Sequence, residues 1–182
     1  MDEDLMETKL QSEEIYRGKL LHVYRDTVRL PDGAAATREW IDHPGACAVV
    51  PFLPDGRVVL VRQCRYPVGK GTLELPAGKL DRGEAPETCA RRELREETGY
   101  TAEKLVPITV MGTAMAFSNE VIHLFAASGL RSGAQCTDDD EFINAAPFAL
   151  PDVYEKIRRG EIDDSKTLVA LLMLKVFPEF LP

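Results

Sequence analysis

Three glutamates of this chain, Glu93, Glu96 and Glu97, have a spacing that can place them around a divalent metal ion. Side chains at positions i, i+3 and i+4 of a helix share one face. Carboxylates packed that closely repel one another, and a bound cation removes the repulsion. Hard ions such as Mg²⁺ prefer oxygen ligands of this kind. The alternative is an acidic helix face in solvent, balanced by three neighbouring arginines.

The residues around these glutamates predict the helix that would position them. Pro86 suits the first turn of a helix, where the missing N–H of proline is not needed. Gly99 suits the position just past a helix end. The sequence therefore predicts a helix over Ala85–Thr98, preceded by a glycine-bounded loop that begins at Gly78.

The wider spacing resembles the Nudix box, the signature of the Nudix hydrolase family. Gly78 is followed after five residues by Glu84, and after seven more by the run Arg92-Glu93-Leu94-x-Glu96-Glu97-x-Gly99. Every fixed position is present, and Tyr100 stands where an aliphatic residue is usual. The resemblance implies an α+β fold, a Nudix α/β/α sandwich with a mixed central sheet, plus a small N-terminal antiparallel sheet.

The resemblance also implies roles for the residues of the box. In the family, box carboxylates and one backbone carbonyl hold metal ions; Mg²⁺ is implied here, with Mn²⁺ as a possible substitute. The implied ligands are Glu93, Glu96, Glu97 and the carbonyl of Ala77. Arg92 matches an arginine that orients a box glutamate from outside the ligand shell. Glu84 is left with two interpretations, a metal ligand or a structural group.

Motifs outside the box resemble the ADP-ribose pyrophosphatase branch of the family. They are Leu73–Leu80, Gln63–Val68, His43–Ala46 and the tail Gly160–Thr167. The resemblance covers nearly all of the chain from Glu14 onward. It implies an enzyme that hydrolyses the diphosphate bond of ADP-ribose, giving AMP and ribose 5-phosphate.

One departure from that branch keeps other functions open. Met115 and Ala116 stand where the branch has a Pro-Gly pair, so the loop takes other backbone angles. Another nucleoside diphosphate sugar, such as GDP-mannose, is therefore an alternative substrate. A non-catalytic nucleotide-binding sensor on the Nudix fold is an alternative of another class, although such proteins usually lose box carboxylates.

Four residues outside the box are candidates for substrate contacts: Arg38, Trp40, Arg65 and Glu120. Trp40 matches a position that stacks on adenine in some members, because an indole offers a large rigid face. It can instead close the small sheet. Arg38 and Arg65 are candidates for phosphate or base contacts, or for surface ion pairs. Glu120 matches a position near the ribose or the metals in relatives.

Hydrolysis also needs a base that takes the proton of the attacking water. In the branch, this base is often a glutamate in an acidic loop well after the box. The run Asp138-Asp139-Asp140-Glu141 occupies that place. Glu141 is the first choice and Asp140 the second, and the alternative is a solvated acidic loop.

The chain is expected to form two parts. Residues 1–42 predict N-terminal strands, after about eleven frayed residues, and 43–182 the Nudix domain. Within the latter, Cys47–Leu53 and Val58–Gln63 predict a buried hairpin. In the ADP-ribose branch the N-terminal sheet pairs with a second subunit, which implies a homodimer.

Composition bounds the partners and the compartment. A net charge of −8 argues against non-specific nucleic-acid binding, which needs a basic surface. The four cysteines form no CxxC pair and predict small core residues in a reduced compartment. The acidic first residues lack an apolar signal core, and the longest apolar run is too short to span a bilayer. We therefore expect a cytoplasmic protein that acts on a small nucleoside diphosphate sugar, with neither nucleic acid nor membrane as partner.

Overall fold

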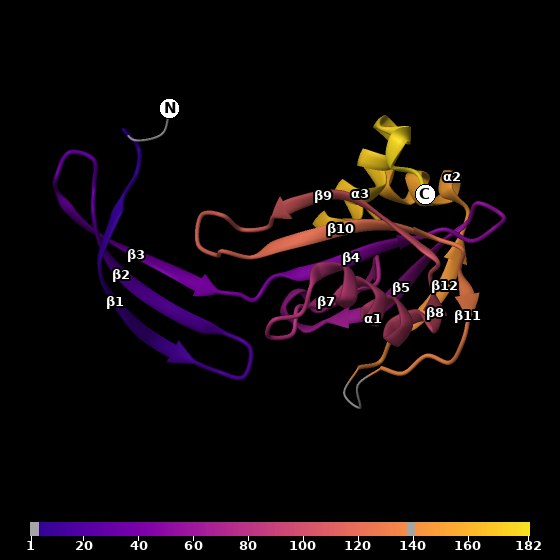
Figure 1. Ribbon diagram of the computed structural model, residues 1–182, viewed down its shortest axis with the longest axis horizontal. Coiled ribbons are helices and arrows are strands. Elements are labelled where there is room, and N and C mark those ends of the chain that lie inside the picture. The colour runs from indigo at the N-terminus through magenta and orange to yellow at the C-terminus, as the bar shows by residue number, and fades with distance from the viewer. Residues whose placement is uncertain (1–3, 138–140) are drawn as a thin grey trace. The chain divides into compact units, whose positions relative to one another are not determined.

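The computed structural model describes residues 4–137 and 141–182 of the chain. Two compact units are present. The first combines Met1–Pro44 with Gly112–Glu120, and the second combines Gly45–Met111 with Val121–Pro182. Figure 1 labels the strands and helices of both units, and each unit is described by itself.

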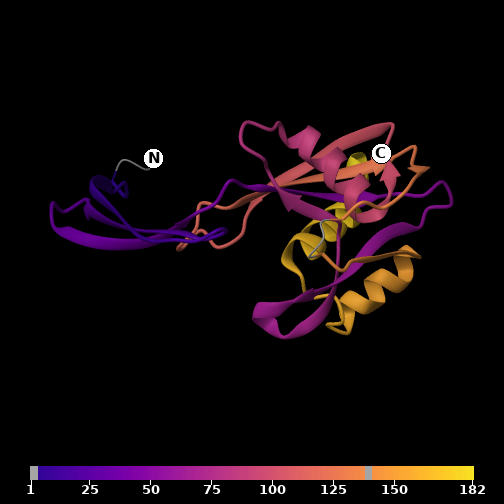
Figure 2. The same ribbon diagram turned by 90° about the horizontal axis from the view of Figure 1, so that it is seen from below.

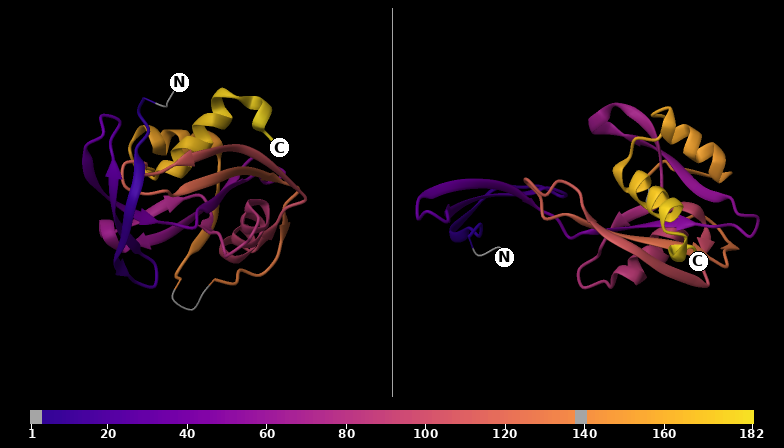
Figure 3. Two further views of the ribbon diagram at one scale, coloured as in Figure 1. Left: turned by 60° about the vertical axis from the view of Figure 1, so that its left-hand side comes forward. Right: turned by 90° about the horizontal axis from the view of Figure 1, so that it is seen from above.

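A three-stranded antiparallel sheet in the order β1-β2-β3 forms most of the first unit (Figure 3). Its strands are β1 (Thr8–Arg17), β2 (His22–Arg29) and β3 (Ala35–Asp42). The expectation that the first eleven residues are frayed is wrong from Thr8 onward. Thr8 already pairs with Arg29, so backbone hydrogen bonds to β2 order this part of the segment.

The loop Gly112–Glu120 belongs to the first unit because it is fastened to the end of β3. The N–H of Ile41 donates to the carbonyl of Phe117 at 2.8 Å. The side chain of Asn119 accepts from the N–H of His43 at 2.8 Å and donates to Asp42 Oδ1 at 2.7 Å.

A four-stranded sheet in the order β7-β4-β10-β9 is the centre of the second unit. Its strands are β4 (Ala46–Pro51), β7 (Ala77–Lys79), β9 (Lys104–Gly112) and β10 (Val121–Ser128). β4 runs parallel to β10 and antiparallel to β7, so the sheet is mixed as predicted.

Both faces of this sheet are covered, as the continuous apolar run of β4 requires. Ala46, Ala48 and Val50 belong to the core that includes α3 (Ser165–Val176). The alternate residues, Cys47 and Val49, belong to the core that includes α1 (Pro86–Thr98). Figure 2 shows these two helices on opposite faces of the sheet. The period of two along a strand explains this division.

A second, antiparallel sheet has the order β12-β5-β6, with β5 (Val58–Arg65), β6 (Lys70–Glu74) and β12 (Asn144–Phe148). The predicted hairpin of β4 with β5 is therefore wrong. The pairing beside the turn is one isolated antiparallel bridge, between Phe52, just past the end of β4, and Val58. β4 already has neighbours on both edges, and so has β5, so neither has an edge free for the other.

The remaining elements complete the second unit. Helix α2 (Leu150–Arg158) precedes α3 near the carboxyl terminus. Two short strands, β8 (Tyr100–Thr101) and β11 (Arg131–Ser132), pair with each other, and the 3₁₀ turns are η1 (Tyr66–Val68) and η2 (Pro178–Phe180). None of the helices in the described residues is long and apolar enough to cross a membrane.

Candidate active site

Helix α1, which carries the box glutamates, begins and ends where the sequence predicted. Pro86 occupies the first turn, and Gly99 follows the last residue in the left-handed region with φ 75°. The N–H of Gly99 donates to the carbonyl of Arg95 at 2.8 Å. A Cβ on Gly99 would lie 2.6 Å from the carbonyl oxygen of Gly133, so both φ and space require glycine here.

Gly78 in β7 allows the carboxylate of Glu93 to lie against the strand. A Cβ built on Gly78 would lie only 2.0 Å from Glu93 Oε1. The side chain of Glu93 is 12% exposed. Burial raises the pKa of Glu93, and the charges of Glu96 and Glu141 add to this effect, while Arg92 lowers it. The box glycine is therefore needed for the position of a carboxylate and not for a turn.

Glu97 is the most buried carboxylate of the box, with 3% of the residue exposed. Its Oε2 accepts a hydrogen bond from the N–H of Ala77 at 3.0 Å. Burial raises the pKa of Glu97 to about 8, against the lowering effect of the Ala77 hydrogen bond. The charges of Glu93 and Glu141 contribute to this rise.

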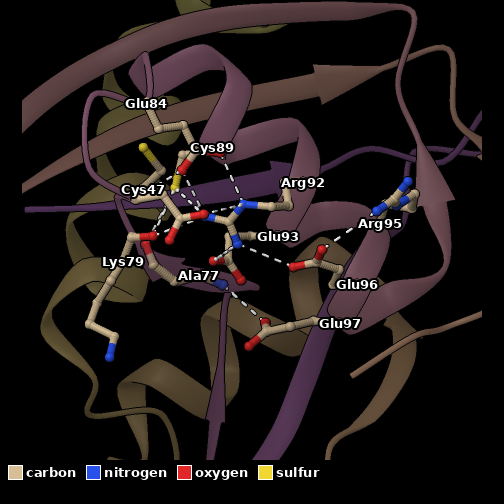
Figure 4. A network of polar contacts seen from close by, with 12 residues as sticks. Cys47, Ala77, Lys79, Glu84, Cys89, Arg92, Glu93, Arg95, Glu96 and Glu97 are labelled. Atoms are coloured by element: carbon tan, nitrogen blue, oxygen red, sulfur yellow. Dashed lines mark hydrogen bonds and ion pairs between the residues drawn. The ribbon is translucent and has the colours of Figure 1, made fainter. Parts of the chain in front are cut away.

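Arg92 is the hub of the hydrogen bonds around the box (Figure 4). Its Nε and Nη2 donate to the two oxygens of Glu84 at 3.0 and 2.8 Å. Its Nη1 donates to Glu93 at 2.5 Å and to Glu96 at 3.2 Å. Nη2 also donates to the carbonyl of Lys79 at 3.0 Å. All three guanidinium nitrogens thus have partners within the box, as an orienting residue would.

Glu84 differs from the other box glutamates in that both of its oxygens accept hydrogen bonds from Arg92. Besides the two bonds from Arg92, Glu84 Oε2 accepts the N–H of Asp81 at 3.0 Å. The hydrogen bonds from Arg92 lower the pKa of Glu84 to about 2. Of its two interpretations, this geometry favours the structural one.

The segment before the acidic run is attached to the end of α1. Gln135 Nε2 donates to the carbonyl of Glu97 at 2.7 Å, and the N–H of Cys136 donates to the carbonyl of Glu96 at 3.0 Å. These bonds satisfy carbonyls that a helix end leaves open. Glu141 lies close enough for its charge to raise the pKa of Glu93 and Glu97. Asp138, Asp139 and Asp140 lie outside the described residues.

The donor set of the box fits a hard divalent cation. Burial, and after it the charges of neighbouring carboxylates, raises the pKa of Glu93 and Glu97, so ionising both is costly without a cation beside them. Within 4–137 and 141–182, no three His, Cys, Asp or Glu side chains are already arranged around a common metal position. The positive group that contacts the carboxylates of Glu93 and Glu96 in the structure is the guanidinium of Arg92.

Arg65 forms an ion pair on the neighbouring sheet. Its Nε and Nη2 donate to the two oxygens of Glu74 at 2.8 and 2.6 Å. Its side chain is 43% exposed, whereas Glu74 is buried. The hydrogen bonds to Glu74 raise the pKa of Arg65 against the lowering effect of burial, and the charge of Glu97 adds a smaller rise, so this pair adjoins the box. Glu74 and its second cation, Lys166, were not predicted as site residues; their only signal was membership of two flanking motifs.

The other three candidates for substrate contacts belong to the first unit. Trp40 stacks on Tyr24 with ring centroids 5.1 Å apart, and its buried indole N–H has no hydrogen-bond partner in the described part of the chain. Arg38 pairs with Glu7.

Glu120 accepts from Thr113 Oγ1 at 2.5 Å, and its other oxygen is 3.4 Å from His43 Nε2. These contacts of Trp40, Arg38 and Glu120 are therefore all made with residues of the first unit.

The prediction that all four cysteines are core residues is half wrong. Cys64 and Cys136 are exposed. Cys47 and Cys89 are buried beneath the box, where Cys89 Sγ contacts the carbonyl of Lys79 at 3.4 Å. The absence of a CxxC pair does not determine which face of a strand, helix or loop each cysteine occupies.

Family models match nearly the whole chain. The NUDIX domain matches residues 42–171, and the nucleoside diphosphate sugar hydrolase N-terminal domain matches residues 7–41. The chain belongs to the Nudix family. This Nudix protein is 40% identical over 174 residues to an ADP-ribose pyrophosphatase of Bacillus subtilis, covering 94% of both chains.

Two other relatives and one solved structure bear on substrate and fold. A methanol dehydrogenase activator of Bacillus methanolicus is 38% identical over 93% of both chains. A GDP-mannose pyrophosphatase of Yersinia enterocolitica is 33% identical over 70% of this chain and 71% of its own. The crystal structure of an ADP compounds hydrolase superposes with a TM-score of 0.84 over 95% of this chain and 94% of its own, at 20% identity. The predicted fold class is confirmed.

Proposed function

We propose that this Nudix protein hydrolyses the diphosphate bond of ADP-ribose. The observation that carries the proposal is the pair Glu93 and Glu97: Glu93 lies against Gly78 of β7, and the buried Glu97 accepts the N–H of Ala77, both with raised pKa values. The similarity to an ADP-ribose pyrophosphatase over 94% of the chain supports this substrate. In the reaction, a water oxygen bonds to one phosphorus, the bridging P–O bond breaks, and AMP and ribose 5-phosphate leave.

We propose that Glu93, Glu96, Glu97 and the carbonyl of Ala77 hold Mg²⁺, which Mn²⁺ can replace. When bound, such an ion neutralises phosphate oxygens and lowers the pKa of water. Arg92 keeps the carboxylates of Glu93 and Glu96 in place through Nη1. It is a positioning residue, and its own contacts are all within the box.

Glu141 is the proposed general base. A carboxylate accepts the proton of the attacking water when it lies within hydrogen-bond reach of it. The support is electrostatic: the charge of Glu141 acts on both Glu93 and Glu97. Asp140 remains the second candidate.

The substrate contacts are proposed at four residues: Arg65, Arg38, Trp40 and Glu120. Arg65 uses Nε and Nη2 for Glu74, which leaves Nη1 to be directed at a phosphate oxygen. Trp40 is the proposed surface for the base. One face of its ring is already covered by Tyr24, so the other face would meet the ligand.

A homodimer is proposed because the first unit has almost no core of its own. Among its described residues only Asp26 and Val28 are buried, and all ten residues of β1 are exposed. Exposed apolar side chains on this unit include Leu10, Ile15, Tyr16, Leu20 and Leu21. A second copy would bury such a surface, and sedimentation of the purified protein measures whether it does. The domain boundary after residue 42 and a cytoplasmic location stay predictions.

Two alternatives follow from specific observations. Met115 is 82% exposed, and neither it nor Ala116 has a positive φ, so the loop presents a flexible thioether side chain where Pro-Gly would present a rigid ring. This loop favours testing GDP-mannose as a substrate. A non-catalytic nucleotide sensor would bind ADP-ribose without turning it over.

One substrate panel separates these functions. Purified protein is incubated with ADP-ribose, GDP-mannose and other nucleoside diphosphate sugars in Mg²⁺ or Mn²⁺, and nucleoside monophosphate is quantified by chromatography. The proposal expects ADP-ribose to have the highest kcat/KM. A preference for GDP-mannose would make GDP-mannose the substrate in place of ADP-ribose. Tight binding of ADP-ribose in calorimetry without product would make the protein a sensor in place of an enzyme.

A further inference from the structure

The segment Glu74–Ala77, which leads into the box, is held by two helices. The carboxylate of Glu74 accepts from Lys166 Nζ. The N–H of Leu75 donates to Thr167 Oγ1 at 2.9 Å. The N–H of Ala77 donates to Glu97 at 3.0 Å. The first turn of α3 and the last turn of α1 therefore fix this segment at opposite ends.

The first turn of α3 is itself rigid because Asp164 caps it. Asp164 Oδ2 accepts from the N–H of Thr167 at 3.0 Å and from its hydroxyl at 2.6 Å. Asp164 Oδ1 accepts from Lys166 Nζ at 3.0 Å. Lys166, 6% exposed, thus lies between the carboxylates of Asp164 and Glu74.

Glu74 joins this turn to Arg65. Its Oε1 accepts from Arg65 and from Thr72 Oγ1 at 2.6 Å, and its Oε2 accepts from Arg65 and Lys166. Burial raises the pKa of Glu74, but Arg65, Lys166 and Thr72 together lower it to about 2. An ionised, buried carboxylate between two cations is held in one orientation. Because Arg65 donates two hydrogen bonds to it, the orientation of the Arg65 guanidinium is fixed as well.

Stability alone does not require this buried lysine. Taking an ion pair out of water costs several kcal/mol per ion, and apolar residues of similar volume are often as stabilising. A surface pair, Lys70 with Asp163, already connects β6 to the segment before α3. Lys166 therefore contributes mainly to the orientation of Glu74 and Arg65.

We propose that Lys166 is a positioning residue for the diphosphate site, acting through Glu74 on Arg65. It fixes the Glu74 carboxylate, which engages Nε and Nη2 of Arg65 and directs the third nitrogen at the substrate. This inference rests on the proposed function, in which Arg65 contacts a phosphate. It gives the tail motif Asp164–Thr167 a role in substrate binding.

A double-mutant cycle tests this inference with steady-state kinetics on ADP-ribose. The variants are Lys166→Met, Arg65→Ala and their combination, and Lys70→Met is the matched control. We expect Arg65→Ala to raise KM about tenfold and Lys166→Met about fivefold, with kcat changed less than about threefold, because substrate binding is lost and not chemistry. The double variant should raise KM no more than about twofold beyond Arg65→Ala, because both changes remove one contact. Lys70→Met should match the wild type.

Several results would overturn the inference. Multiplicative KM effects in the double variant, or a loss of kcat on both backgrounds, would show that Lys166 acts on the fold and not through Arg65. If Lys166→Met does not fold, Glu74→Gln/Lys166→Met removes both charges and should reproduce the KM of Arg65→Ala; a wild-type KM would refute the coupling. A wild-type enzyme that hydrolyses no nucleoside diphosphate sugar refutes the proposed function instead.

Discussion

Gly78→Ala tests whether the box depends on the position of one carboxylate. The added Cβ would lie 2.0 Å from Oε1, 2.1 Å from Cδ and 2.3 Å from Oε2 of Glu93. All three of these nearest atoms belong to the end of the Glu93 side chain. Glu93 must therefore leave β7.

The size of the effect follows from this overlap. Real Cβ contacts are essentially never shorter than 3.0 Å, so the Glu93 carboxylate must withdraw by about 1 Å or more. A misplacement of about 1 Å can cost about 100-fold in catalysis, and we expect kcat to fall by that order. The fold should survive. Gly78 has no positive φ, so alanine introduces no backbone strain, and it removes conformational freedom from the unfolded chain.

Kinetics and melting curves measure the two effects separately. Gly71→Ala is the matched control, since Gly71 also lies in a strand without a positive φ and its nearest neighbour, the carbonyl of Gln63, is 3.9 Å away. Gly71→Ala should keep full activity. Gly78→Ala should add nothing to Glu93→Ala, because both disable the same group. Full activity of a folded Gly78→Ala variant would refute the reasoning.

Two further predictions concern pH. Glu97 has a folded pKa of about 8, above its ordinary value of 4.5, so its ionisation lowers stability increasingly as pH rises from 4.5 to 8. In chelator, the melting temperature of Glu97→Gln should therefore exceed that of the wild type at pH 9 and equal it near pH 4.5. The variant should also lose most activity. A melting-temperature difference that is the same at both pH values would contradict this. Glu74 has a folded pKa of about 2, so its stabilising effect is present above pH 4.5 and lost as pH falls through 2. Denaturant titrations from pH 6 to 2 should show wild type losing up to about 3 kcal/mol relative to Glu74→Gln; parallel curves would refute this.

The sequence predicted those parts of the fold that local signals specify. Helix α1 is defined by Pro86 and Gly99, which act within their own turns. The pairing of β4 is different, because its partners β7 and β10 lie about 30 and 75 residues further along the chain. A turn after Leu53 reverses the chain, but it does not determine which strand becomes the neighbour.

The same limit applies to the site. Arg65 was predicted either to contact substrate or to form a surface ion pair, and the structure shows a pair with a buried partner. That partner, Glu74, is nine residues away, and its second cation, Lys166, is 92 residues from it. Residue type identifies charge, whereas burial and partners decide what the charge does, and these come from tertiary packing.

The box illustrates this distinction among four residues of one type. Glu84 has two bonds from Arg92 and one from a backbone N–H, and its pKa falls to about 2. Glu97 has one backbone N–H, and its pKa rises to about 8. Arg92 carries one positive charge, and its guanidinium contacts Glu84, Glu93 and Glu96 and lies 4.0 Å from Asp81, while Arg95 adds a second contact to Glu96. Burial and neighbouring carboxylates raise the pKa of both Glu93 and Glu97, and a cation bound beside them would favour their ionised forms.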